Sequence, residues 1–470
     1  MVAIMSISPP DELLAMLRSG GQIFIIKGEA GTGKTTLAME IIRSIEEDGG
    51  CGFYLSTRVP IDKIFMQFPW LKELKIEDKI LDARKTILPK IDKYFIEFLT
   101  SQDFLKVIYS KVSQEKKKPI VIIIDSIDAL KADLDIPPED FSIEKMMVEI
   151  SERTGANTIF ISEGVKETKL DYIADSIIIL RKKYINGRVI RNLELEKTRT
   201  TEIKRPVIIF SIKDSRFIHF TSKVLEYPTK PLDVSIPEEN TVHVSTLIEE
   251  FDKILSGGFE KGSINIIEAG RGVGRDYRWV SAPPALNLVF KKKPAFFIPS
   301  EGYSPASVRK WFEPMIGKEL YRRYIHVFQF STTGTSSEKN IHVIDWADSV
   351  TDYKTIRETI SSVLDELGTE EFFFYVGADT LEHLYGAENL KRIIGRLAKD
   401  AKDSSGVFLV VVKTGQKILE GLDHLASTYF KMESLAGITL FYGLLPATNT
   451  YSLVIEETDE KIIPKLIPIE

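Results

Sequence analysis

The chain has 470 residues, of which 43% are hydrophobic, a formal net charge of −6 and one cysteine. A chain of this length exceeds what one hydrophobic core usually serves, so we expect two domains. The weak negative charge argues against a protein that binds nucleic acid through its charge. The single Cys51 excludes an internal disulfide, and no apolar run reaches the length of a membrane span. Together these features predict a cytoplasmic protein without a membrane segment.

The first half alternates short apolar runs with helical patterns, as α/β domains with mostly parallel sheets do. Predicted strands cover residues 23–26, 53–55, 120–124, 159–161, 177–180, 189–195 and 207–210. The five consecutive β-branched residues of Ile120–Ile124 predict a central strand that is covered on both faces. The polar residues 72–118 have a mostly helical pattern and are interpreted as an insertion between two strands.

A phosphate-binding loop follows the first predicted strand. Residues Gly28–Thr35 form a complete G-x-x-x-x-G-K-T motif, and a helical pattern that ends near Glu47 comes next. Glycines let backbone N–H groups surround phosphates, Lys34 supplies positive charge at the β- and γ-phosphates, and the Thr35 hydroxyl is placed to bind Mg²⁺. The predicted nucleotide-binding residues of this segment are Gly28, Glu29, Ala30, Gly31, Thr32, Gly33, Lys34, Thr35 and Thr36. The motif therefore predicts a nucleoside triphosphate site that holds ATP and Mg²⁺.

Asp125 ends the most hydrophobic predicted strand. Ligands of parallel sheets bind at the carboxyl ends of the strands, so a carboxylate here is the expected metal partner of Thr35. Asp125 could instead cap the helix that continues from Ala129, and the two roles are compatible.

The second half repeats the first. Gly21–Ile26 recurs as Gly262–Ile267, Ile124–Leu130 as Ala378–Leu384, and Leu170–Ser176 as Leu422–Thr428. Similar offsets at three ordered places indicate a tandem duplication. We predict a first domain at residues 1–226, a proline-containing linker at 227–240 and a second domain at 241–470.

Four segments carry a family resemblance. They are Asp125–Leu130, Leu170–Leu180, Leu193–Thr200 and Phe251–Ser263. All four resemble the RecA/KaiC superfamily, and the last is similar to the segment that opens a KaiC or RadA ATPase domain. The resemblance covers nearly the whole chain and implies an α/β fold of two tandem RecA-like domains, each a mostly parallel sheet flanked by helices.

The resemblance also implies a catalytic contribution from a neighbouring subunit. In KaiC-like proteins a Lys-x-Arg pair reaches the nucleotide of the next subunit, and Lys197 and Arg199 hold those positions here. Cations supplied across an interface stabilise charge on the transferring phosphoryl group. On this reading the protein is a homo-oligomer, a ring or a dimer. The alternative is an exposed edge strand with alternating charges.

One departure from the superfamily pattern affects catalysis. KaiC and RecA relatives carry a catalytic glutamate just after the second strand, whereas Leu55–Pro60 contains no carboxylate. Its Ser-Thr-Arg-Val run is similar to P-loop proteins grouped with GvpD, the gas-vesicle regulator. Arg58 could contact the γ-phosphate or pair with a nearby carboxylate, and Asp128 and Glu163 are the candidates for orienting water. Slow hydrolysis is expected, with the loop acting more as a switch than as a motor.

The second phosphate loop, Ala269–Asp276, has lost the key residues. Lys34 corresponds to Arg275 and Thr35 to Asp276, and Pro283 and Pro284 interrupt the following helix. Both cations of the Lys-x-Arg pair are replaced in Leu444–Pro446, while Asp379 and the carboxylate Glu301 are retained. We expect a pseudo-ATPase domain that regulates or scaffolds.

The leading hypothesis is a KaiC/GvpD-like ATPase with an unidentified regulatory protein partner. A RadA-like, DNA-binding recombination ATPase is an alternative that the acidic balance disfavours. A third hypothesis is a nucleotide-gated interaction switch without turnover.

Overall fold

The computed structural model describes residues 2–83, 101–199, 202–233, 235–238, 240–331, 336–419, 422 and 424–470. The chain divides into two compact units. The N-terminal unit contains Met5–Phe220 and Ile469–Glu470, and the C-terminal unit contains Met1–Ile4 and Thr221–Pro468. The predicted domain ranges are 1–226 and 241–470. In the structure, residues 1–4 belong to the C-terminal unit, and residues 469–470 belong to the N-terminal unit.

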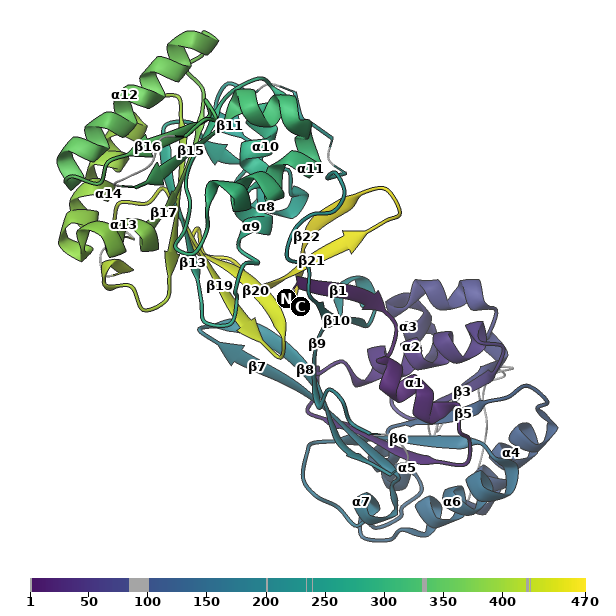
Figure 1. The fold of residues 1–470 in the computed structure, drawn as a ribbon. Coiled ribbons are helices and arrows are strands. Elements are labelled where there is room, and N and C mark those ends of the chain that lie inside the picture. The colour runs from purple at the N-terminus through teal and green to yellow at the C-terminus, as the bar shows by residue number, and fades with distance from the viewer. Residues whose placement is uncertain are drawn as a thin grey trace. The chain divides into compact units, whose positions relative to one another are not determined.

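The N-terminal unit is built on one sheet of mostly parallel strands (Figure 1). Its strands are β2 (Ile23–Gly28), β3 (Cys51–Ser56), β4 (Ile80–Asp82), β5 (Ile120–Asp125), β6 (Asn157–Glu163), β7 (Ser176–Ile185), β8 (Arg188–Thr198), β9 (Val207–Ser211) and β10 (Ile218–Lys223). Their order is β4-β3-β5-β6-β2-β7-β8-β9-β10, parallel as far as β7 and antiparallel beyond it.

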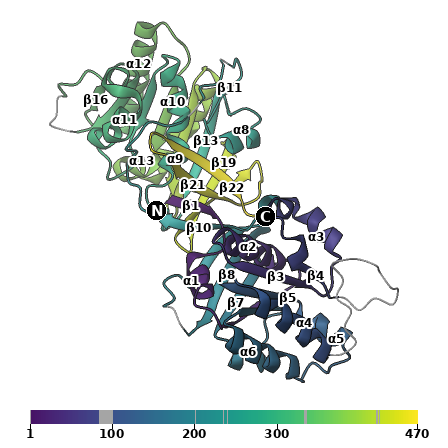
Figure 2. The same ribbon diagram turned by 90° about the vertical axis from the view of Figure 1, so that its right-hand side faces the viewer.

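Helices cover both faces of this sheet (Figure 2). They are α1 (Asp11–Leu17), α2 (Lys34–Glu47), α3 (Ile61–Gln67), α4 (Ser101–Gln114), α5 (Ile127–Asp133), α6 (Ser142–Thr154) and α7 (Leu170–Ile173), with short 3-10 turns at Pro69–Leu74, Glu77–Lys79 and Lys213–Ser215. Alternate residues of β2 point to opposite faces: Phe24 and Ile26 pack with α1, α2 and α3, whereas Ile23 and Ile25 pack with α4, α5 and α6. The all-apolar strands are thus explained by burial on both sides.

All seven strands predicted for the first half are present in this sheet. The interpretation of residues 72–118 as mostly helical is wrong at one point, because Ile80–Asp82 forms β4 and pairs with β3. A three-residue strand is too short to show an alternating pattern, and only its long-range pairing defines it. Residues 84–100 of that segment lie outside the described residues.

The C-terminal unit has the same strand order. Its strands are β11 (His243–Val244), β12 (Phe259–Glu260), β13 (Ser263–Ala269), β14 (Ala295–Ile298), β15 (Ile325–Phe330), β16 (Ile341–Ile344), β17 (Phe373–Gly377), β18 (Val407–Lys413), β19 (Thr428–Leu435), β20 (Ile438–Leu445), β21 (Tyr451–Glu457) and β22 (Ile462–Pro468). The order β15-β14-β17-β18-β13-β19-β20-β21 matches β4-β3-β5-β6-β2-β7-β8-β9 strand by strand. The α/β class predicted from the sequence is confirmed.

Further pairings complete this sheet. β16 pairs with β15, β22 pairs with β21, and β11 pairs with β12 as a separate ribbon. β1 (Val2–Ile7) adds to β21 through Ala3 and Val454. The helices are α8 (Glu249–Ile254), α9 (Arg278–Ser281), α10 (Pro283–Phe290), α11 (Pro305–Tyr324), α12 (Ser349–Leu367), α13 (Ala378–Tyr385) and α14 (Ala387–Lys402), with a 3-10 turn at Lys417–Leu419.

The structure bears on two features noted in the sequence, the single cysteine and the lack of a long apolar run. Cys51 is buried, and burial raises the pKa of its thiol to about 12, so the thiol stays protonated and unreactive at neutral pH. Within the described ranges, no helix is both long and apolar enough to cross a membrane.

A buried histidine pair makes the stability of the C-terminal unit depend on pH. His326 on β15 and His342 on β16 lie 3.1 Å apart, Nδ1 to Nε2, and burial together with His342 lowers the pKa of His326 to about 4. Between pH 6.5 and 4 the unfolded chain therefore binds a proton that the folded chain excludes, so stability falls as the pH falls through this window, by about 3 kcal/mol for this group.

The expected result is that His326→Phe loses part of this acid sensitivity. Urea unfolding of the C-terminal unit at pH 7 and pH 5 measures it, with the exposed His383→Gln as the control variant. An unchanged pH dependence in His326→Phe would refute the assignment.

Candidate functional site

The phosphate loop connects β2 to α2 and is held by close backbone packing. A Cβ on Gly28 would lie 2.7 Å from the carbonyl oxygen of Leu180, so only glycine fits there. Gly31 and Gly33 have φ of +73° and +103°, values that side chains other than glycine rarely adopt. Gly33 begins α2, whose free N–H groups and dipole favour an anion at this end. The loop therefore has the backbone of a phosphate site.

Lys34 lies buried under the loop. Its Nζ donates to the carbonyl oxygens of Gly28 at 2.7 Å and Glu29 at 3.0 Å and lies 3.4 Å from the Glu163 carboxylate. The amine is thus positioned at the loop, and its only charged partner among the described residues is Glu163. An anion in the loop would compete with that carboxylate for Lys34.

Thr35 and Asp125 come together as the sequence predicts. The Thr35 hydroxyl donates to Asp125 Oδ2 at 2.8 Å, and the Tyr54 hydroxyl donates to the same oxygen at 2.6 Å. Burial and the negative charge of Asp125 raise the pKa of Tyr54, so its hydroxyl stays protonated and donates. A hydroxyl and a carboxylate side by side are the oxygen ligands that Mg²⁺ takes at such sites, so the residues present fit this metal.

Thr57, just beyond β3, fixes the backbone that carries Asp125. Its hydroxyl accepts from the Ser126 N–H at 2.7 Å and donates toward the Asp125 carbonyl oxygen at 2.9 Å. The sequence reasoning missed both Tyr54 and Thr57. The pairing of β3 with β5, which sets Ser56 opposite Asp125, could have pointed to them once the strand order was known.

Arg58 pairs with a carboxylate in this structure. Its Nη1 lies 2.8 Å from Glu163 Oε1, while Lys34 contacts the other oxygen of the same carboxylate. Asp128 accepts the backbone N–H of Glu163 at 2.9 Å and so holds the end of β6. Glu163 and Asp128 are the two predicted candidates for orienting water. Glu163 lies beside Lys34, whereas Asp128 accepts a hydrogen bond from the backbone of Glu163.

Lys197 and Arg199 contact α7 and its flanking turns within their own unit. Lys197 Nζ donates to the Asp171 carbonyl oxygen at 2.8 Å, and Arg199 pairs with Asp175 at 3.2 Å and donates to the Tyr172 carbonyl oxygen at 3.0 Å. Burial and the nearby Arg199 lower the pKa of Lys197. No described contact joins either cation to the phosphate loop of this chain. Their role toward a neighbouring subunit stays a prediction.

Arg191, which the sequence did not single out, supports the loop from the β8 side. It is 5% exposed, and its Nη1 donates to the Gly31 carbonyl oxygen at 2.8 Å. Its Nε donates to the backbone carbonyl of Glu470. Arg191, which is far from the loop in the sequence, thus anchors the loop backbone at Gly31.

In the second phosphate loop, the residues that replace the lysine and the threonine have partners within the C-terminal unit. Asp276, at the position of Thr35, is 3% exposed and accepts from the Thr439 hydroxyl. Arg275, at the position of Lys34, pairs with Glu226 and lies over the Tyr303 ring at 5.1 Å. The first loop is therefore the one that retains the lysine and the threonine of the phosphate-loop motif.

The prolines break the helix after the second loop, as predicted. The N-terminal unit has the unbroken α2, whereas α9 ends at Ser281 and α10 begins at Pro283. The retained Asp379 lies in the first turn of α13, and Glu301 lies 3.6 Å from His383.

Comparisons with known proteins agree with this geometry. Residues 15–196 match the family model of the GvpD gas vesicle protein, P-loop domain. The chain is 22% identical to Protein GvpD2 of Halobacterium salinarum over 93% of its length and 91% of that protein. It is also 22% identical to Protein GvpD1 of the same organism, over 95% of this chain and 93% of that protein. Residues 15–196 are therefore similar to the GvpD P-loop domain, and the chain is similar to GvpD proteins over most of its length, which confirms the resemblance to GvpD drawn from its sequence.

Proposed function

We propose that the N-terminal unit binds Mg-ATP at Gly28–Thr35 and hydrolyses it slowly, and that the protein uses the bound nucleotide to regulate a protein partner. The observation that carries this proposal is the 2.8 Å contact of Thr35 with Asp125 beside the buried Lys34. The similarity of residues 15–196 to the P-loop domain of the GvpD gas vesicle protein supports nucleotide binding at this loop.

The residues divide the work as follows. Lys34 and the backbone N–H groups of the loop hold the negative charge of the phosphates. Thr35 and Asp125 supply oxygen ligands for Mg²⁺, which when bound neutralises charge on the β- and γ-phosphates. Glu163 orients a water molecule that attacks the γ-phosphorus as the bond to the β-phosphate oxygen breaks, giving ADP and phosphate.

Slow turnover follows from the placement of Glu163. Leu55–Pro60, at the end of β3, contains no carboxylate, and Glu163 is held by Lys34 and Arg58. A carboxylate paired with two cations must leave them before it can orient a water molecule, and it competes with the γ-phosphate for both of them. In this proposal, nucleotide binding is therefore linked to the release of the Glu163 carboxylate from Lys34 and Arg58.

The C-terminal unit is proposed to regulate or scaffold. Its loop has Arg275 and Asp276 in place of the lysine and the threonine, and both are engaged within the unit. Lys197 and Arg199 are proposed to complete the site of a neighbouring subunit in a dimer or ring, after leaving their contacts at Asp171 and Asp175.

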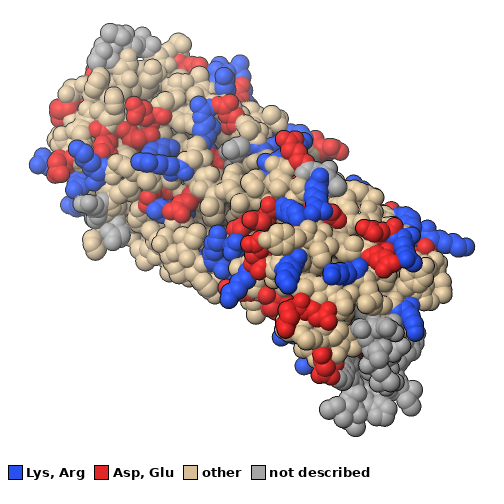
Figure 3. Space-filling model, turned by 90° about the horizontal axis from the view of Figure 1, so that it is seen from below, with Lys and Arg blue, Asp and Glu red and all other residues tan. Residues whose placement is uncertain are grey.

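Two alternatives remain as outcomes of the tests. On the face seen in Figure 3, basic and acidic side chains are interspersed, which does not favour the RadA-like, DNA-binding alternative. Tight and steeply salt-dependent binding of single-stranded DNA would favour it. Absence of turnover in every oligomeric state, with nucleotide binding intact, would favour the switch.

Glu163→Gln tests the central step. We expect nucleotide affinity to rise about three- to tenfold, because the competing charge is removed, and turnover to fall roughly 100-fold, as when a group that positions a reactant is lost. Isothermal titration calorimetry and single-turnover hydrolysis measure the two effects, with the exposed Glu167→Gln as the control. If neither quantity changes, Glu163 has no role in the reaction.

Arg199→Ala tests the contribution from a neighbouring subunit. In the wild type, hydrolysis per subunit is expected to rise with protein concentration as subunits associate, and in Arg199→Ala this rise is expected to be lost. The exposed Lys182→Ala serves as the control. A concentration-independent wild-type rate would reject the shared site.

A further inference from the structure

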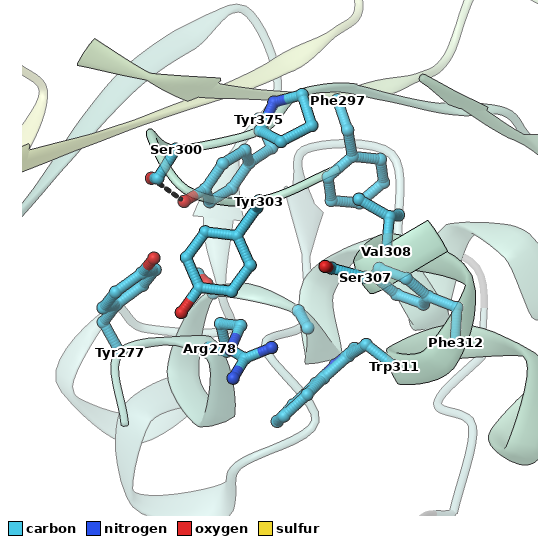
Figure 4. A pocket seen from close by; sticks show the side chains of 13 residues that line it. Tyr277, Arg278, Phe297, Ser300, Tyr303, Ser307, Val308, Trp311, Phe312 and Tyr375 are labelled. Carbon is cyan, nitrogen blue, oxygen red and sulfur yellow. Dashed lines mark hydrogen bonds between the residues drawn. The ribbon is translucent and has the colours of Figure 1, made fainter. Parts of the chain in front are cut away.

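A pocket in the C-terminal unit lies between α9, α11 and the ends of β14 and β17 (Figure 4). Counting its mouth, it encloses about 430 Å³. Part of that space is open to solvent, and the walls are largely aromatic, which suits one small ring rather than a nucleotide. The proline break between α9 and α10 shortens the helix that is continuous in the N-terminal unit, and Arg278, Ser281 and Ala282, just before the break, line the pocket.

A buried cation lines the pocket. Arg278 is 9% exposed, and its guanidinium lies 4.7 Å from the Trp311 ring and 4.9 Å from the Tyr303 ring. Nε and one terminal nitrogen donate to the backbone carbonyls of Arg275 at 3.4 Å and Glu226 at 3.1 Å. Among the described residues no acceptor contacts the other terminal nitrogen, and no carboxylate pairs with Arg278.

The surrounding charges leave this cation unbalanced. Asp379 is the carboxylate that interacts with the pocket wall, and it also faces Lys413, whose Nζ lies 3.6 Å from the Tyr277 ring. Burial, and also the charge of Arg278, lowers the pKa of Lys413, burial raises the pKa of Asp379, and no described contact joins Asp379 to Arg278. A buried charge without its counter-ion is costly, so an anion entering the pocket would gain from Arg278.

One buried hydrogen-bond donor of the pocket has no acceptor among the described residues. Trp311 is 3% exposed, and its Nε1 is buried without an acceptor in the described part of the chain. The Ser300 and Tyr375 hydroxyls are hydrogen-bonded to one another at 2.9 Å, a contact that is drawn as a dashed line in Figure 4. Burial raises the pKa of Tyr375, which keeps its hydroxyl protonated. Buried donors of this kind usually have a partner, so the missing partner is an acceptor.

We propose that this pocket binds a small aromatic carboxylate. The carboxylate accepts from the free terminal nitrogen of Arg278 and from Trp311 Nε1. The ring of the ligand packs among the aromatic and aliphatic walls, to which Phe297, Val308 and Phe312 contribute. The site is separate from the phosphate loop of the N-terminal unit and gives the C-terminal unit a ligand of its own.

The test titrates the full-length chain with benzoate and with benzamide, its neutral analogue of the same shape. We expect saturable benzoate binding, followed by calorimetry and tryptophan fluorescence, and at least about tenfold weaker binding of benzamide because the charge is absent. Arg278→Met is expected to lose at least about tenfold in benzoate affinity, while the exposed Arg271→Met, from the same loop, is expected to bind as the wild type does.

Two further arms keep the outcome decisive. Lys34→Ala is expected to bind benzoate normally, since the phosphate loop takes no part. Equal binding of benzoate and benzamide by the wild type would overturn the proposal without relying on any variant. Absence of benzoate binding at millimolar concentration would overturn it as well, as would unchanged benzoate affinity in a folded Arg278→Met protein.

Discussion

Lys34→Ala is expected to weaken nucleotide binding by roughly 100-fold, because the variant loses the charge-assisted hydrogen bonds that the amine makes to phosphate. The amine is buried and already lies at the loop, where it donates to the carbonyl oxygens of Gly28 and Glu29. Little reorganisation is therefore required when a phosphate arrives. Calorimetric titration with ATP and Mg²⁺ measures the loss.

The duplicated architecture offers a matched control for this variant. Arg275→Ala changes the corresponding position of the second loop, where the side chain pairs with Glu226. It is expected to leave nucleotide affinity unchanged. If Arg275→Ala abolished binding and Lys34→Ala did not, the nucleotide would belong to the C-terminal unit and the proposed function would be wrong.

Lys131→Met is expected to destabilise the N-terminal unit by about 3–5 kcal/mol, because it leaves a buried carboxylate without its cation. Lys131 on α5 and Glu144 on α6 pair at 2.5 Å, and their side chains are 7% and 2% exposed. Lys131 also donates to the Pro138 carbonyl oxygen and lies 4.4 Å above the Phe141 ring. Urea unfolding followed by circular dichroism measures the change.

The pH dependence of this variant has a defined sign. Burial raises the pKa of Glu144 above its usual range. The folded state therefore binds the proton more tightly than the unfolded state, and the destabilisation in Lys131→Met is expected to shrink as the pH falls through the folded-state pKa. The double variant Lys131→Met with Glu144→Met is expected to recover most of the lost stability, since two apolar side chains replace the pair. The exposed Lys145→Met is the control, and a loss as large in that variant would contradict the explanation.

Local patterns were sufficient for much of the fold. The apolar run of Ile120–Ile124 predicted a strand buried on both faces, and the structure places it as β5 in the interior of the sheet. The prolines at 283 and 284 predicted the break between α9 and α10. The short β4 escaped prediction because three residues carry no periodicity, and its pairing with β3 alone defines it.

Some residues of the candidate site could likewise be predicted from local sequence, whereas others come together only through tertiary packing. The Gly28–Thr35 motif and the strand-end Asp125 follow from residues that are local in the sequence. Glu163 lies 129 residues from Lys34 and 105 residues from Arg58, and only the packing of β6 beside β2 brings it to both. The support of Gly31 by Arg191, 160 residues away, has no local signature at all.

The sequence by itself therefore determined an intact phosphate loop, its degenerate duplicate and an α/β fold, because each depends on residue types at short spacing or on a repeated order. The tertiary structure alone decided which carboxylate faces the loop lysine, where Arg58 points and how an aromatic pocket surrounds Arg278 in the second unit. The physical reason is that the order of strands in a sheet decides which strand ends become neighbours, and contacts between neighbouring ends leave no periodic trace along the chain.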